Sequence, residues 1–159
     1  MARFLIVGCG CRGQALAREL VAAGHIVRGT TRDPAKLAAI EAAGAEAVVA
    51  DPYRLATVMP LLDGASAVVW LMGTANGSAD AVEAVHGPRL ESMLELIVDT
   101  HARGFVYETG GVERELGVHA ARCAAEVYEM PIAILDADPG DREGWLGDAR
   151  QAALRLLEA

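Results

Sequence analysis

Short apolar runs alternate with helix-like patterns along the whole chain. Residues 4–7 form an apolar run, the next segment places Leu16, Leu20 and Val21 on one helical face, and a second apolar run follows Gly24. Further strands are expected at 45–50, 66–72, 105–107 and 132–135, and further helices at 34–43, 52–62, 88–98, 116–129 and 145–157. Because parallel strands need long crossover connections, which are usually helices, this alternation predicts a doubly wound parallel α/β sheet of about six strands. The expected strand order is 3-2-1-4-5-6.

The hydropathy pattern also separates buried strands from loops. Residues 68–72 are continuously apolar, which is typical of a strand covered on both faces of a parallel sheet. Residues 73–80 are mostly small or polar and are predicted to form a loop. No repeat, low-complexity tract or linker interrupts the pattern, so residues 1–159 are expected to form a single domain.

The first turn between strand and helix carries three glycines. Gly8, Gly10 and Gly13 follow the pattern G-x-G-x-x-G, in which the first permits a tight turn, the second admits a pyrophosphate and the third lets the helix pack closely on the sheet. The phosphates would lie at the helix N-terminus, beside Cys11 and Arg12. The motif therefore predicts a dinucleotide-binding βαβ unit. The alternative is a glycine-rich turn that binds no nucleotide.

The end of the second expected strand indicates which dinucleotide binds. Proteins specific for NAD carry an Asp or Glu about 20 positions after the glycines, where it binds the ribose 2′-hydroxyl. Here Thr31 occupies that position and Arg32 follows it. A hydroxyl and a guanidinium can donate to a 2′-phosphate, whereas a carboxylate would repel it, so the pattern favours NADP over NAD. The alternative is that Asp33 takes the role of the acid, although Asp33-Pro34 also resembles a helix cap.

The composition excludes several classes of partner. Hydrophobic residues make up 53% of the chain and the formal net charge is −8, which argues against a nucleic-acid or anionic-membrane surface. No apolar run approaches the ~20 residues of a membrane span, and Met1-Ala2-Arg3 leads directly into a strand, so a cytoplasmic location is expected. The cysteines, two of them Cys9 and Cys11 in the glycine loop, lack the spacing of a zinc site, and no metal is expected.

These residues make the chain resemble the atypical and extended short-chain dehydrogenases/reductases, particularly their epimerase-like group. The resemblance rests on the G-C-G-x-x-G loop and the G-H-x-V-x-G-x-x-R strand that follows, and it weakens after Gly73. It implies an NAD(P)-binding Rossmann fold. It also implies contacts with each part of the dinucleotide: the pyrophosphate at Gly8, Gly10 and Gly13, the adenosine ribose phosphate at Thr31 and Arg32, the adenine edge at Asp51, and the nicotinamide ribose at Gly73 and Thr74.

The resemblance breaks at the catalytic residues. Enzymes of this family use a Tyr-x-x-x-Lys pair together with a Ser or Thr at the end of the fifth strand, but Lys36 is the only lysine of this chain, so the pair is absent. Thr109 is the candidate for the hydroxyl. His119 is the other candidate, because a neutral imidazole can act as an acid or a base near neutral pH; the alternative is a surface histidine near a helix start. The C-terminal substrate-binding lobe of extended members is not expected.

Two functional classes remain open. The first is a nucleotide-binding or redox-sensing module, which the absent Tyr-x-x-x-Lys pair favours. The second is a small NAD(P)H-dependent oxidoreductase that acts on a carbonyl or quinone substrate, in which the cofactor supplies the chemistry. A homodimer is also expected, because apolar residues of the terminal helix occupy more than one narrow stripe: Trp145, Leu146, Ala149, Ala153, Leu154 and Leu157.

Overall fold

The structure is a computed structural model that describes residues 1–75, 78–110 and 114–158. Six parallel strands form one sheet in the order β3-β2-β1-β4-β5-β6, which confirms the predicted doubly wound α/β fold. The strands are β1 (Arg3–Val7), β2 (Ile26–Thr31), β3 (Glu46–Val49), β4 (Ala67–Trp70), β5 (Gly104–Glu108) and β6 (Ile132–Leu135). The strand order reverses between β1 and β4, so their carboxyl ends border the crevice where this fold binds its ligands.

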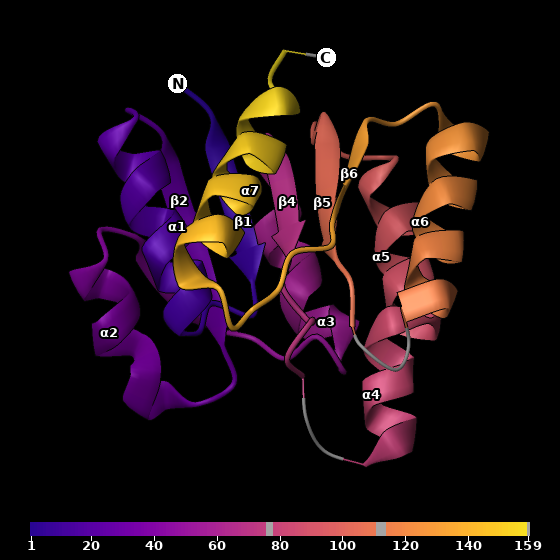
Figure 1. Cartoon of the computed structure of the whole chain (residues 1–159), viewed down its shortest axis with the longest axis horizontal. Helices are drawn as coiled ribbons and strands as arrows, with labels where there is room; N and C mark the ends of the chain where they lie inside the picture. Colours follow the sequence, from indigo (N-terminus) through magenta and orange to yellow (C-terminus); the bar gives the residue numbers. More distant parts are fainter. Residues whose placement is uncertain (76–77, 111–113, 159) are drawn as a thin grey trace.

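Helices cover both faces of the sheet (Figure 1). One face carries α1 (Cys11–Ala22), α2 (Leu37–Ala42) and α7 (Arg142–Arg155), and the other carries α3 (Leu55–Val58), α4 (Ala79–His86), α5 (Pro88–Ile97) and α6 (Arg114–Tyr128). Strands β4 and β5 are buried along their whole length, as expected for central strands covered on both sides.

Each face of the sheet has its own apolar core. Ile6 points toward the core that Leu16 of α1 and Trp145 of α7 complete, whereas the preceding Leu5 points toward the core around Trp70 on the opposite face. Successive residues of a strand alternate between faces, so the single strand β1 contributes to both cores. The helices on either side are thereby fixed relative to the carboxyl edge of the sheet.

Two regions differ from the sequence-based expectation. Helix α4 begins at Ala79, inside the predicted loop, and Ser78 caps it by accepting a hydrogen bond from the N–H of Ala81 at 3.2 Å; residues 76–77 of that loop lie outside the described residues. The helix expected at 52–62 is reduced to the single α turn of α3 and a 3-10 turn, because Pro60 has no N–H to continue the α-helical hydrogen bonds.

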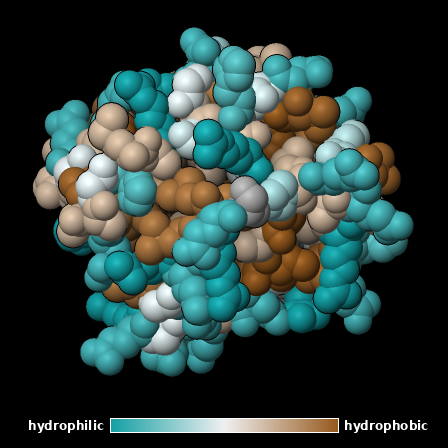
Figure 2. Space-filling view, turned by 90° about the horizontal axis from the view of Figure 1, so that it is seen from above, coloured by the Kyte–Doolittle hydropathy of each residue, from teal (hydrophilic) through white to brown (hydrophobic). Residues whose placement is uncertain are grey.

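The surface is mixed in polarity. Figure 2 shows the side of the molecule that carries the N-terminus, where hydrophobic areas are separated by hydrophilic side chains. Large exposed apolar side chains are scattered over several elements, as with Val49, Val98 and Val127. Among the described helices, none has both the length and the apolar character needed to cross a membrane.

Candidate nucleotide site

The glycine loop connects β1 to α1 at the crevice. Gly8 has a φ of +86°, and a Cβ atom there would lie 2.6 Å from the carbonyl oxygen of Leu71, so this turn requires glycine. Gly10 precedes the helix, and no atom lies within 4 Å of the position that its Cβ would take. Gly13 is buried, with the Sγ of Cys9 3.3 Å from its would-be Cβ. The loop thus combines a tight turn, an open approach to the backbone and close helix packing.

The first turn of α1 faces this opening without a side-chain cap. Gly10 occupies the N-cap position and has no side chain that could accept the free N–H groups of the turn. Such a helix end, with the positive end of its dipole, is suited to an anion. A buried threonine behind the loop holds it in place: the N–H of Gly8 donates to the Oγ1 of Thr30 at 3.1 Å, and the N–H of Cys9 donates to the carbonyl of Thr30 at 2.8 Å. The position of Thr30 near the end of β2 predicts that it lies beside the crevice, but its hydrogen bonds to the glycine loop could not be predicted from the sequence.

Polar side chains at the end of β2 are arranged by local hydrogen bonds. The Oγ1 of Thr31 accepts from the N–H of Asp33 at 3.1 Å, and the carboxylate of Asp33 accepts from the N–H of Ala35 at 2.9 Å. Asp33 is therefore the cap of the 3-10 turn that begins at Pro34. Arg32 is exposed, and its guanidinium lies over the ring of Tyr53, 5.1 Å from the ring centroid. A positive charge and an aromatic face thus lie side by side here.

Asp51, which follows β3, belongs to the same corner. Its carboxylate accepts from the N–H of Tyr53 at 2.9 Å, and the neighbouring Ala50 donates its N–H to the carbonyl of Thr31 at 3.0 Å. The second of these bonds joins the carboxyl ends of β2 and β3. The structure therefore brings Thr31, Arg32 and Asp51 to one corner of the crevice, on the side of the glycine loop away from β4.

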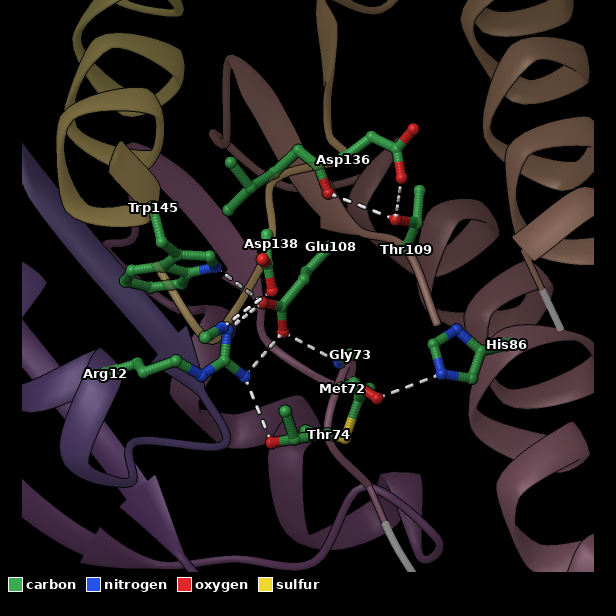
Figure 3. A network of polar contacts seen from close by, with 12 residues as sticks. Arg12, Met72, Gly73, Thr74, His86, Glu108, Thr109, Asp136, Asp138 and Trp145 are labelled. Atoms are coloured by element: carbon green, nitrogen blue, oxygen red, sulfur yellow. Dashed lines mark hydrogen bonds and ion pairs between the residues drawn. The ribbon is translucent and has the colours of Figure 1, made fainter. Parts of the chain in front are cut away.

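On the other side of the glycine loop, a polar cluster surrounds Glu108 at the end of β5 (Figure 3). The guanidinium of Arg12 donates to both carboxylate oxygens of Glu108, one of these contacts measuring 3.0 Å. The N–H of Gly73 donates to the same carboxylate at 2.7 Å, and the indole N–H of Trp145 donates at 2.8 Å. Arg12 also donates to the Oγ1 of Thr74 at 3.1 Å, and its guanidinium lies 4.6 Å from the centre of the Trp145 ring.

The environment of Glu108 explains why a carboxylate is tolerated there. Its side chain is 2% exposed and that of Arg12 is 19% exposed. A buried charge is costly unless it is paired and fully hydrogen-bonded, and removing one partner of such a pair costs about 3–5 kcal/mol. The cluster joins α1, β5 and α7 with the segment after β4. The sequence identified no partner for Glu108, because the residues that surround it come from distant parts of the chain.

Thr109 follows Glu108 but belongs to a different set of contacts. Its hydroxyl donates to the carboxylate of Asp136 at 2.6 Å, and the guanidinium of Arg114 donates to the other oxygen of that carboxylate at 2.7 Å and 2.9 Å. The hydrogen bonds from Arg114 and then Thr109 lower the pKa of Asp136 below its usual value. The Thr109 hydroxyl, a predicted catalytic group, is thus directed at a carboxylate after β6 and not at Arg12.

The predicted catalytic His119 lies elsewhere. It is exposed on α6, its Nε2 is 3.5 Å from the Sγ of Cys123, and it lines a shallow groove between α5 and α6. The structure does not bring it together with Thr109 or the glycine loop. Another histidine, His86, is buried nearer the site, with its Nδ1 2.6 Å from the hydroxyl of Tyr107 and its Nε2 2.9 Å from the carbonyl oxygen of Met72. Within the described ranges, no group of three or more His, Cys, Asp or Glu side chains could hold a metal ion.

Comparison with known proteins identifies the family. The model of the NAD(P)H-binding family matches residues 8–130, which include the glycine loop, the β2 corner and Glu108. The chain belongs to the NAD(P)H-binding family. No curated protein matches the sequence significantly.

Several solved structures share this fold. The UDP-glucuronic acid 4-epimerase of Bacillus cereus, solved with UDP-glucuronic acid and NAD, is 17% identical, with a TM-score of 0.66 over 83% of this chain and 55% of its own. Vestitone reductase from alfalfa is 14% identical, with a TM-score of 0.63 over 84% of this chain and 56% of its own. BdcA from E. coli is 17% identical, with a TM-score of 0.69 over 84% of this chain and 80% of its own. This chain therefore spans just over half the length of the epimerase and the reductase.

Proposed function

We propose that this NAD(P)H-binding protein prefers NADP to NAD and acts as a nucleotide-binding module. The observation that supports the preference is the arrangement after β2. Asp33, the acid that could have bound a ribose 2′-hydroxyl, instead caps the 3-10 turn, while Arg32 is exposed beside Tyr53. A guanidinium at this corner attracts the 2′-phosphate that only NADP carries.

Calorimetric titration with NADP and NAD tests this preference. Arg32→Ala should weaken NADP binding about tenfold to a hundredfold and leave NAD nearly unchanged, because a charge-assisted hydrogen bond is worth about 1.5–3 kcal/mol. Thr31→Asp should reverse the preference by placing a carboxylate against the phosphate. Arg28→Ala is the matched control, since Arg28 lies on β2, just before Arg32, but pairs with Glu46 at 3.0 Å. Equal binding of both nucleotides by the unmodified protein, or an Arg32→Ala loss shared by both, would contradict the proposal.

The proposal of a module without turnover rests on the catalytic groups. The chain has no lysine after Lys36 and hence no Tyr-x-x-x-Lys pair, and the Thr109 hydroxyl is hydrogen-bonded to Asp136. We expect the protein to bind NADPH without consuming it when aldehydes, quinones and flavins are offered in turn. Steady oxidation of NADPH, followed by its absorbance, would favour the alternative of a small oxidoreductase.

A further inference from the structure

We propose that the Arg12–Glu108–Trp145 cluster restricts this site to the adenosine half of the dinucleotide and leaves the nicotinamide half in solvent. The inference rests on the proposed nucleotide-binding function and specifies which chemical part of the ligand is recognised. The class of ligand is a nucleoside diphosphate with a 2′-phosphate.

A dinucleotide in this fold spans the reversal of strand order, with one nucleotide on each half of the sheet. The adenosine half lies over the strand that follows the glycine helix, where the ribose 2′-position is read. In this chain that half is accessible: Gly10 has open space beside it, and Arg32 is exposed next to the ring of Tyr53. The pyrophosphate would lie on the uncapped first turn of α1.

The half formed by β4 and β5 is already filled by side chains of the protein. The Glu108 carboxylate rests directly on Gly73, so closely that a Cβ on Gly73 would lie 2.5 Å from the Cδ of Glu108. The N–H of Gly73, which lies three residues after the end of β4, is occupied by that carboxylate at 2.7 Å. The indole of Trp145 and the guanidinium of Arg12 then cover Glu108 from the side of α7 and α1 (Figure 3). A nicotinamide nucleoside placed beside Gly73 would have to displace all three side chains.

Displacing the cluster is unfavourable because its charges satisfy one another. Moving Glu108 would leave Arg12 without its carboxylate partner and Trp145 without the acceptor of its N–H. A nicotinamide ring and its ribose carry no negative charge, so they could not replace the carboxylate against Arg12. The pyrophosphate could approach Arg12, but adenosine 2′-phosphate 5′-diphosphate, which lacks the nicotinamide nucleoside, also carries both bridging phosphates.

Calorimetry with matched ligands tests the inference on the unmodified protein. Adenosine 2′-phosphate 5′-diphosphate keeps the adenosine half and both bridging phosphates, and nicotinamide mononucleotide represents the other half. We expect NADP and the adenosine fragment to bind within about threefold of each other, and nicotinamide mononucleotide not to bind. NADPH should bind while its nicotinamide fluorescence keeps the emission of the free compound.

Other results would contradict the inference, and they can be distinguished from a failure of the proposed function. Binding of NADP at least about tenfold tighter than the fragment, or a blue-shifted and enhanced NADPH emission, would overturn the inference while leaving the proposed function intact. If neither NADP nor the fragment binds, the proposed function fails and the inference fails with it.

Glu108→Ala tests the role of the cluster itself. Removing this side chain opens the space beside Gly73 and frees the N–H groups of Gly73 and Trp145. The affinity for NADP should then exceed that for the adenosine fragment by about tenfold or more, because only NADP has a nicotinamide nucleoside that can occupy this half. Any new contact of Arg12 with the phosphates would be common to both ligands and would leave this ratio unchanged. Glu46→Ala, which removes a surface glutamate paired with Arg28, is the matched control and should leave the ratio unchanged. A correctly folded Glu108→Ala protein with an unchanged ratio would overturn the inference, and if this variant does not fold, the titrations of the unmodified protein still decide.

Discussion

Cys9, a residue of the glycine loop, has a packing role in the core and not a reactive one. Its side chain lies between two glycines: a Cβ on Gly29 would be 2.7 Å from its Sγ, and one on Gly13 would be 3.3 Å away. The thiol therefore fills the gap between α1 and β2, where two residues without side chains leave room for it. Burial without a neighbouring positive charge disfavours the thiolate and raises the pKa of Cys9 to about 12.

Selective alkylation should reveal this difference among the three free cysteines. The thiolate is the reactive form, and a pKa that is raised to about 12 leaves almost none of it at about pH 8. We expect iodoacetamide to modify the exposed Cys11 and Cys123 in the folded protein and Cys9 only after unfolding, as followed by mass spectrometry. Modification of Cys9 at the same rate as Cys11 in the native state would contradict this.

The site residues that could be located from the sequence are those whose contacts lie close to them along the chain. The glycine loop, Thr31 and Arg32 occupy one βαβ unit, so spacing alone located them at the carboxyl edge. The cap role considered for Asp33 is confirmed for the same reason, since its acceptor contact is with Ala35. Glu108 could not be interpreted from sequence, because 96 positions separate it from Arg12 and 37 from Trp145.

At the scale of elements, the strands were predicted more accurately than the short helices. Continuous apolar runs identified β4 and β5 because both of their faces are buried. Helix α4 was missed because it has only 8 residues and begins within a stretch of small and polar residues, although it buries Val85 and His86. Its start depends on the Ser78 cap, a signal that is easily read as a loop residue.

The docking of α6 on the sheet depends on Gly117. A Cβ at this helical position would lie 1.7 Å from the hydroxyl oxygen of Tyr107, which is fully buried and contacts His86. Glycine normally costs a helix about 1 kcal/mol relative to alanine. We nevertheless expect Gly117→Ala to lower the free energy of unfolding by about 1–3 kcal/mol, because the methyl group would overpack a rigid contact.

The matched control for this substitution is on α7. Gly147 lies within that helix, and beyond the backbone of the helix itself nothing lies within 4 Å of its would-be Cβ. Gly147→Ala should therefore stabilise the protein by up to about 1 kcal/mol, as helix propensity alone predicts. Urea denaturation of the two variants should show shifts of opposite sign. A stabilised Gly117→Ala protein would mean that Tyr107 can move without cost.

At the scale of the whole molecule, the strand order was predictable because it follows from alternation and from the handedness of crossover connections. The expectation of a dimer relied on the apolar residues of α7, and the structure gives several of these residues another role. Helix α7 buries Trp145, Ala149 and Ala153 in the core of its own protomer. Its apolar residues therefore have a function that requires no second copy of the chain.

Sedimentation of the purified protein checks the dimer directly. The apolar side chains that remain exposed include Val127, which is 72% exposed, and Tyr128, at 39%, both at the end of α6. If a homodimer forms at micromolar concentration, Val127→Asp should shift it toward the monomer, because an interface at this end of α6 would bury the new charge. A monomeric unmodified protein would refute the expectation.

The contact between Arg12 and Glu108 also constrains how the chain acquires its structure. The first βαβ unit can form from local contacts, but the Glu108 carboxylate is neutralised only after α1, β5 and α7 have come together. An intermediate with the second half of the sheet formed alone would hold an unpaired charge in an apolar layer, at a cost of several kcal/mol. Closing so long a loop is also entropically unfavourable and is expected late in folding. The two halves of the sheet should therefore unfold in one cooperative transition, without a populated state in which only one half persists.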